Sequence, residues 1–98
     1  MAIADMEDGH PYRVVTDDAA LVVVRVGEEV FALDDRCTHQ KVALSEGFVD
    51  SSDRVIECPR HGSQFSLEEG TALQLPATKP VRTHPVRVVD GVVEVLVS

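Results

Sequence analysis

The sequence predicts an all-β protein of antiparallel strands, and three observations support this fold class. Val, Ile and Leu cluster in short runs that are separated by Gly, Asp and Pro. Apolar residues show no sustained recurrence at the three-to-four-residue spacing of an amphipathic helix, so helices should be few. Two residue pairs that contain glycine, at positions 27–28 and 90–91, stand where tight hairpin turns belong. These features favour a scaffold of hairpins over a helical fold.

Two hairpins are expected, one in each half of the chain. The first covers residues 20–33, ALVVVRV-GE-EVFAL, and glycine in its first turn position suits a two-residue turn. The second covers residues 84–97, HPVRVV-DG-VVEVLV, where Asp90 and Gly91 supply the two positive φ angles of a type I′ turn. Both hairpins should belong to the main β scaffold.

The segment between the hairpins, residues 34–80, has shorter apolar runs than the hairpins and more loop-forming residues. Short strands are expected at GFVD, RVIEC and QFSL, which cover residues 47–50, 54–58 and 64–67. The segment EEGTALQLPATKP, residues 68–80, is expected to be irregular. We therefore expect a single domain over residues 1–98, with a small loop-bearing subdomain inserted at about 34–80.

Composition excludes several classes of function. The 98 residues include 17 acidic and 9 basic side chains, and the formal net charge of -8 repels nucleic acid phosphates and anionic lipid surfaces. The first twelve residues are acidic rather than basic and apolar, unlike a secretory signal, and no stretch is apolar enough to span a bilayer. We expect a cytoplasmic protein that binds neither nucleic acid nor membrane.

Two short segments in the middle of the chain contain residues that can bind a metal ion. They read Cys37-x-His39 and, after eighteen intervening residues, Cys58-x-x-His61. A structural disulfide is disfavoured in a reducing cytoplasm, which makes metal binding the better interpretation. Two ordinary buried cysteines with surface histidines remain an alternative, as does a Cys2His2 zinc site. Because each segment mixes a thiolate with an imidazole, a two-iron cluster fits better: the two thiolates can take one iron and the two imidazoles the other.

At these positions the sequence resembles the Rieske [2Fe-2S] family. The likeness rests on CTH at 37–39, CPRHGSQF at 58–65 and the closing PVRTHPVRVVDGVVEV at 80–95, and it covers most of the chain from about Val22 onward. The resemblance implies a Rieske-type antiparallel β-sandwich in which the inserted subdomain binds one [2Fe-2S] cluster per chain.

The same resemblance assigns the ligands. It implies that Cys37 and Cys58 ligate the inner iron, whereas His39 and His61 ligate the outer, more exposed one. Neutral imidazoles make the cluster less negative than four thiolates would, so the reduction potential rises. Because a ligating imidazole keeps a second ring nitrogen that can lose a proton, the potential should fall with pH in the alkaline range.

Four further residues refine the expected cofactor site. Gly62 should let the backbone approach the inorganic sulfides. Ser63 matches a family position that places a hydroxyl near a bridging sulfide, and Pro76 matches a loop that covers the cluster. Phe65 stands where high-potential members have a tyrosine, which favours a potential toward the low end of the roughly −150 to +300 mV Rieske range.

The function implied by the resemblance is that of an electron carrier rather than an enzyme. We expect a monomeric ferredoxin that passes electrons from an NAD(P)H-dependent flavin reductase to a terminal aromatic ring-hydroxylating oxygenase. Two alternatives remain open at this point: the small subunit of an assimilatory nitrite reductase and a zinc-stabilised binding module. Lys41 and Arg60 flank the expected histidine ligands and suggest a locally basic rim for docking.

Overall fold

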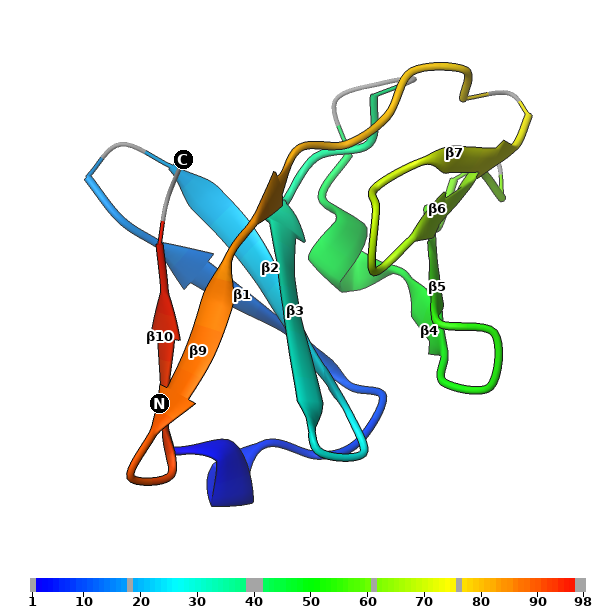
Figure 1. Cartoon of the computed structure of the whole chain (residues 1–98). Coiled ribbons are helices and arrows are strands. Elements are labelled where there is room, and N and C mark those ends of the chain that lie inside the picture. The colour runs from blue at the N-terminus through cyan, green and yellow to red at the C-terminus, as the bar shows by residue number, and fades with distance from the viewer. Residues whose placement is uncertain (1, 18, 39–41, 61, 76, 97–98) are drawn as a thin grey trace.

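A computed structural model describes residues 2–17, 19–38, 42–60, 62–75 and 77–96. Within these ranges the regular structure consists of ten strands in three antiparallel sheets, with two short 3-10 helices, η1 (Ile3–Asp5) and η2 (Leu44–Glu46). The expected all-β class is confirmed, and Figure 1 shows the three sheets side by side. The described chain contains no helix of the length and apolarity needed to cross a membrane.

The central layer is a four-stranded sheet, here called the base sheet. In spatial order its strands are β1 (Pro11–Val15), β2 (Ala20–Val26), β3 (Glu29–Asp34) and β8 (Thr83–His84). Strands β2 and β3 form the first predicted hairpin: Val26 pairs with Glu29, and Gly27 has a φ of 63° in the turn. Strand β1 was not predicted from the sequence.

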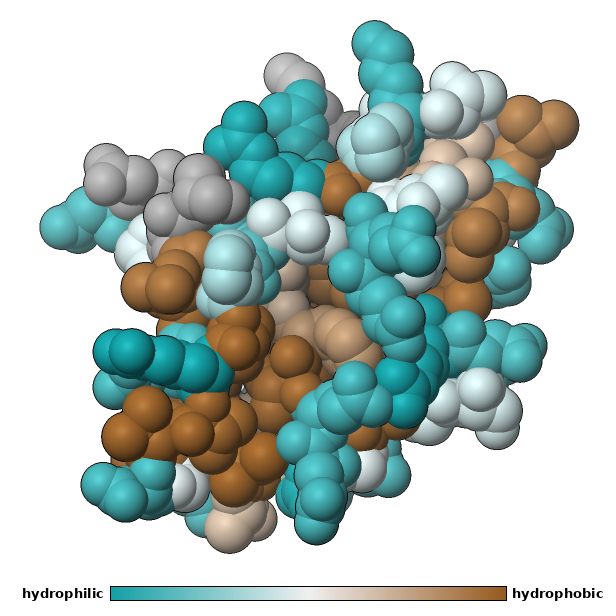
Figure 2. Space-filling model, viewed as in Figure 1, coloured by the Kyte–Doolittle hydropathy of each residue, from teal (hydrophilic) through white to brown (hydrophobic). Residues whose placement is uncertain are grey.

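The second sheet is the C-terminal hairpin, β9 (Val86–Val89) and β10 (Val92–Val95). Its turn has φ angles of 51° at Asp90 and 76° at Gly91, so the predicted type I′ turn is confirmed. His84, which the prediction placed in this hairpin, belongs instead to β8, where it pairs with Ala32 of the base sheet. Figure 2 shows apolar side chains gathered over the lower end of this hairpin.

The third layer, here called the small sheet, lies on the other side of the base sheet (Figure 1). Its strands are β4 (Phe48–Asp50), β5 (Val55–Glu57), β6 (Gln64–Ser66) and β7 (Ala72–Gln74). The first three lie within the predicted short strands. The prediction of an irregular segment at 68–80 was wrong at β7. This is an edge strand with an exposed Leu73, so its sequence lacks the apolar alternation that marks a half-buried strand.

The strand β2 is buried on both faces. On one face Val22 and Val24 enter the main core between the base sheet and the small sheet, together with Ile56 and Phe65. On the other face Val23 packs into a second core beneath the C-terminal hairpin. Burial on both faces explains why β2 reads as a continuous apolar run rather than an alternating one.

Arg54 connects the base sheet to the small sheet. Its guanidinium pairs with Glu29 at 2.5 Å and with Glu68 at 2.6 Å, and it lies 5.9 Å from the centre of the Phe31 ring. The hydrogen bond to Glu68, followed by that to Glu29, raises the pKa of Arg54 above its ordinary value. The side chain therefore stays charged and links the start of β3, at Glu29, to the turn that carries Glu68.

Candidate metal centre

The first ligand loop begins three residues after β3 ends. The side chain of Cys37 is buried, with 1% of its surface exposed. Its backbone N–H donates to the carbonyl oxygen of Val42 at 2.8 Å, which closes the loop. His39 and Lys41, the predicted ligand and rim residue, lie outside the described residues.

The second ligand loop follows β5 directly. Cys58 is as buried as Cys37, and its backbone N–H donates to the carbonyl oxygen of Ser63 at 2.8 Å. The N–H of Gly62 also donates to the carbonyl of Cys58, at 3.3 Å. His61, the fourth predicted ligand, lies outside the described residues.

The two loops are closed by the same type of backbone hydrogen bond, although their Cys–His spacings differ. In each loop the cysteine N–H bonds to the carbonyl of the fifth residue after it. Both cysteines also belong to the same main core, between the base sheet and the small sheet. Two similarly closed loops thus bury their sulfur atoms in one apolar region, an arrangement that the different Cys-x-His and Cys-x-x-His spacings do not reveal.

The chemistry of the donor set can be tested on the described residues. Cys37 and Cys58 are both thiols, with no disulfide between them. In the part of the chain that the structure describes, no three Cys, His, Asp or Glu side chains form a group able to hold a metal ion. A complete site therefore needs further donors beside the two buried thiols.

The backbone at Gly62 leaves room beside the second ligand loop. Gly62 has a φ of 73°, a conformation that side chains other than glycine rarely adopt. Apart from Gly62 itself and its two chain neighbours, no described protein atom lies within 4 Å of the position that a Cβ would take. This space fits the expected close approach of an inorganic sulfide to the backbone.

Ser63 and Phe65 are both fully buried behind the second loop. The Oγ of Ser63 accepts a hydrogen bond of 3.2 Å from the N–H of Ala77. Because an accepting hydroxyl keeps its own hydrogen, Ser63 can still donate to a sulfide. Phe65 has no hydroxyl to donate. Pro76 itself lies outside the described residues, but its neighbour Ala77 is tied to Ser63.

A third segment, residues 77–80, is thus held to both ligand loops. On the first loop the Oγ1 of Thr38 donates to the carbonyl oxygen of Lys79 at 2.7 Å. On the second loop the bond from Ala77 to Ser63 has the same role. These contacts keep the segment that follows Pro76 against the site.

Sequence reasoning missed the buried carboxylate of Asp35. It accepts hydrogen bonds from Arg13 Nη1 at 2.7 Å, from the N–H of Ser45 at 2.7 Å and from the Oγ of Ser45 at 2.6 Å. These bonds connect β1, the start of the first ligand loop and η2. The only signal in the sequence was an acidic pair, Asp34-Asp35, directly after an apolar strand.

Comparison with known proteins identifies the family. The model of the Rieske [2Fe-2S] domain matches residues 1–85. The chain belongs to the Rieske [2Fe-2S] family. The buried thiols, the two similarly closed loops and the space beside Gly62 fit the cluster that defines this family. The family therefore favours the iron–sulfur cluster over the zinc alternative.

The relatives narrow the function to electron transfer. The anthranilate 1,2-dioxygenase ferredoxin subunit of Burkholderia cepacia is 40% identical over 97 residues, which cover 99% of this chain and 88% of the relative. The 3-phenylpropionate/cinnamic acid dioxygenase ferredoxin subunit of Escherichia coli K12 is also 40% identical, over 91% of this chain and 82% of the relative. Relatives named as ferredoxin subunits are electron-transfer components, so this Rieske protein is an electron carrier rather than the catalyst.

Solved structures agree with this assignment. A chain in the complex of reduced oxygenase and oxidised ferredoxin of carbazole 1,9a-dioxygenase is 41% identical. The likeness covers 97% of this chain and 96% of that one, with a TM-score of 0.91. A small subunit of an NADPH nitrite reductase has a TM-score of 0.85 over 99% of this chain and 94% of that one, but at 22% identity it shows only a shared fold.

Proposed function

We propose that Cys37 and Cys58 hold the inner iron of a Rieske [2Fe-2S] cluster and that His39 and His61 hold the outer iron. Residues 34–80 serve as the cluster-binding subdomain. The observation that carries this proposal is the burial of both thiols in one core by two similarly closed loops. The histidine that follows each cysteine then falls on the same two loops.

The residues of this chain set the environment of the cluster. When bound, a cluster of this type accepts and returns one electron at a time. The main core excludes water from the sulfur end, which strengthens the hydrogen bonds and charges that act there. Gly62 leaves its side of the site open, and the hydroxyl of Ser63 is available to stabilise added negative charge on a sulfide. Pro76 is proposed to cover the cluster, because segment 77–80, which follows it in the sequence, is bonded to both ligand loops.

The proposed electron path leads from an NAD(P)H-dependent flavin reductase through this monomer to a terminal aromatic ring-hydroxylating oxygenase, all in the cytoplasm. The acceptor is supported by the relatives, which are ferredoxin subunits of dioxygenases, and by the complex of a ferredoxin with its oxygenase. Lys41 and Arg60 contribute a basic rim near the outer iron. Of these two, the described residue Arg60 is exposed, as docking requires.

The cluster is tested by purifying the protein without oxygen and measuring iron, acid-labile sulfide, visible absorbance and the EPR spectrum of the reduced state. We expect two irons and two sulfides per chain. His39→Gln and His61→Gln should lose the cluster, while His10→Gln, which changes an exposed histidine, should retain it. A colourless protein that lacks iron and sulfide, or retention of the native spectrum in His61→Gln, would contradict the ligand assignment.

The partners are tested by electron transfer from the reduced protein. Stopped-flow mixing with a terminal oxygenase should reoxidise the cluster rapidly, and mixing with a sirohaem nitrite reductase should not. The reverse preference would favour the nitrite reductase subunit. Glu substitutions of Lys41 and Arg60 should slow the preferred reaction and change its salt dependence; an unchanged rate would remove the rim from the proposal.

A further inference from the structure

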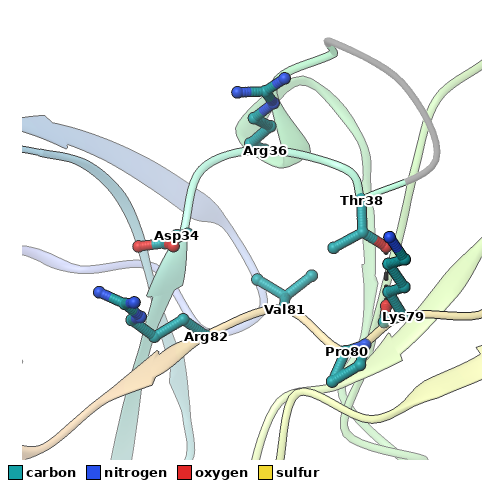
Figure 3. Close-up of a pocket in the computed structure, with 7 residues that line it drawn as sticks. All are labelled: Asp34, Arg36, Thr38, Lys79, Pro80, Val81 and Arg82. Carbon is teal, nitrogen blue, oxygen red and sulfur yellow. Dashed lines mark hydrogen bonds between the residues drawn. The ribbon is translucent and has the colours of Figure 1, made fainter.

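A cleft of about 550 Å³ opens where the base sheet meets the small sheet. One wall is segment 34–38, which carries Cys37, and the other is segment 79–82, which leads into β8 (Figure 3). Seven residues line the cleft: Asp34, Arg36, Thr38, Lys79, Pro80, Val81 and Arg82. One of them, Val81, also belongs to the core that buries the two thiols.

Two hydrogen bonds define the shape of the cleft. At one end the N–H of Asp34 donates to the carbonyl oxygen of Arg82 at 2.9 Å. At the other end the Oγ1 of Thr38 donates to the carbonyl of Lys79 at 2.7 Å. Val81, which is buried, lies between these ends (Figure 3). The two walls are therefore joined to each other at both ends of the cleft.

The charge of the cleft is opposite to that of the whole protein. Three of its lining residues are cations and one is a carboxylate, a formal charge of +2 in a chain of -8. The carboxylate is already engaged, because Asp34 Oδ1 lies 2.7 Å from Nε2 of His84. The field inside the cleft should therefore attract an anionic group.

Two of these cations have no partner within the described part of the protein. Elsewhere Arg13, Arg54 and Arg87 pair with carboxylates, and Arg25 donates to backbone carbonyls. By contrast, no hydrogen bond or ion pair joins the side chain of Arg36 or Lys79 to any residue that the structure describes. Both side chains are exposed. In a chain with 17 acidic residues, these two cations remain available to an external carboxylate.

The cleft also lies next to the metal centre in the chain. Arg36 and Thr38 flank Cys37, and Lys79 follows Ala77, which is bonded to Ser63 of the second loop. A group bound between these walls would contact the segments that hold both ligand loops. Such a contact would bring the bound molecule close to the redox centre.

We propose that this cleft is a docking site for an acidic side chain on the surface of a redox partner protein. In Figure 3 the exposed side chain of Arg36 points away from Lys79 and out of the cleft. Arg36 and Lys79 would therefore turn toward the partner's carboxylate to bind it from opposite walls, with the arginine able to bind it through two parallel N–H groups. A nucleic acid fits less well, since a long polyanion would be repelled by the acidic remainder of the chain. This inference rests on the proposed electron-transfer function and names the chemistry of the partner.

The first test uses the cluster-containing protein and a fluorescently labelled hexaglutamate peptide at low ionic strength, followed by anisotropy. We expect saturable binding that is weakened about three- to tenfold by Arg36→Gln and by Lys79→Gln. Arg87→Gln, which removes the same charge from β9, should leave binding within about twofold. Equal binding by all three variants, or no saturable binding, would overturn the proposal.

Two further measurements distinguish protein docking from small-anion binding and from loss of the cluster. Free glutarate should compete only at concentrations far above those of the peptide; competition at equal concentration would mean a small-anion site and would also overturn the docking proposal. Absorbance and EPR report the cluster in every variant independently. Protein that has the cluster but ignores the peptide contradicts only this inference, while protein that binds the peptide but has no cluster contradicts only the proposed function.

Discussion

The base sheet and the small sheet are both antiparallel, yet they are stabilised in different ways. Strand β2 of the base sheet has seven residues and β3 has six, whereas every strand of the small sheet has three. The base sheet is covered on both faces by separate cores. The small sheet contributes Ile56 and Phe65 to one of those cores, and its loops carry Cys58.

This difference shows which part of the protein can fold on apolar burial alone. Each fully buried Val or Leu of β2 contributes about 1.5–3 kcal/mol, which supports a stable hairpin pair. Strands of three residues bury too little to be stable by themselves and need a staple. A metal cluster bound by the two loops would be that staple, because its binding free energy adds to the folding free energy.

The largest predicted effect is therefore loss of the cluster, by chelation or by Cys58→Ser. We expect the free energy of unfolding to fall by about 3 kcal/mol or more, because the loops lose their shared ligand. Amide hydrogen exchange should show lost protection in β4–β7, while β2 and β3 stay protected. Equal loss of protection in both sheets would mean that the base sheet depends on the cluster as much as the small sheet does.

A second prediction concerns the packing of the small sheet against segment 79–82. A Cβ at Gly70 would lie 2.0 Å from the carbonyl oxygen of Val81, and the φ of Gly70 is 73°. Gly70→Ala should lower the free energy of unfolding by about 3 kcal/mol in chemical denaturation. Gly27→Ala is the matched control in the base sheet. Gly27 has a φ of 63°, but beyond its two chain neighbours no described atom lies within 4 Å of the position of an added Cβ. Gly27→Ala should lower the free energy of unfolding by only about 1–2 kcal/mol. Equal losses in the two variants would refute the role of the close contact between Gly70 and Val81.

The third prediction tests the link from the base sheet to the first ligand loop. Asp35→Ala removes the partner of Arg13 and leaves the N–H of Ser45 without its acceptor. Thermal and chemical denaturation should show a loss of about 1–3 kcal/mol. If the variant matched wild type in stability and cluster content, Asp35 would have no supporting role.

A smaller effect is expected at Ser63, and it should appear in the potential rather than in stability. Ser63→Ala removes a hydroxyl that can donate to a sulfide, so the reduction potential should fall by about 20–60 mV. The bond to Ala77 is lost as well, at a cost of about 1 kcal/mol. Voltammetry measures the shift in Ser63→Ala beside a control, Ser66→Ala, whose half-buried Oγ on β6 accepts from the N–H of Glu69 instead. A potential unchanged in both would show that Ser63 only holds the loop.

The smallest effect should come from the C-terminal hairpin. Arg87 pairs with Glu94 at 2.6 Å across the exposed face of β9 and β10. Exposed pairs contribute little, so Glu94→Gln should change the free energy of unfolding by about 0.5 kcal/mol or less. If Glu94→Gln lowered the free energy of unfolding by more than about 1 kcal/mol, the C-terminal hairpin would depend on this ion pair for its stability.

Sequence patterns were most informative where local rules operate. The two hairpin turns follow from Gly27 and from Asp90-Gly91, because positive φ angles restrict which residues can occupy a tight turn. The two Cys/His segments were visible because their residue types and spacing are unusual. Strand β7 was missed because an edge strand needs no apolar alternation, and β1 because its burial depends on its neighbours.

The amino-acid sequence by itself determined the all-β class, the hairpins and the pair of Cys/His segments, since all three depend on residues close together in the chain. Only the tertiary structure decided that both thiols share one core, that Asp35 supports the first loop and that Thr38 bonds to Lys79. The same holds for the basic cleft, whose walls come from segments 34–38 and 79–82. Contacts between distant segments depend on how the sheets pack, and no local pattern in the chain records that packing.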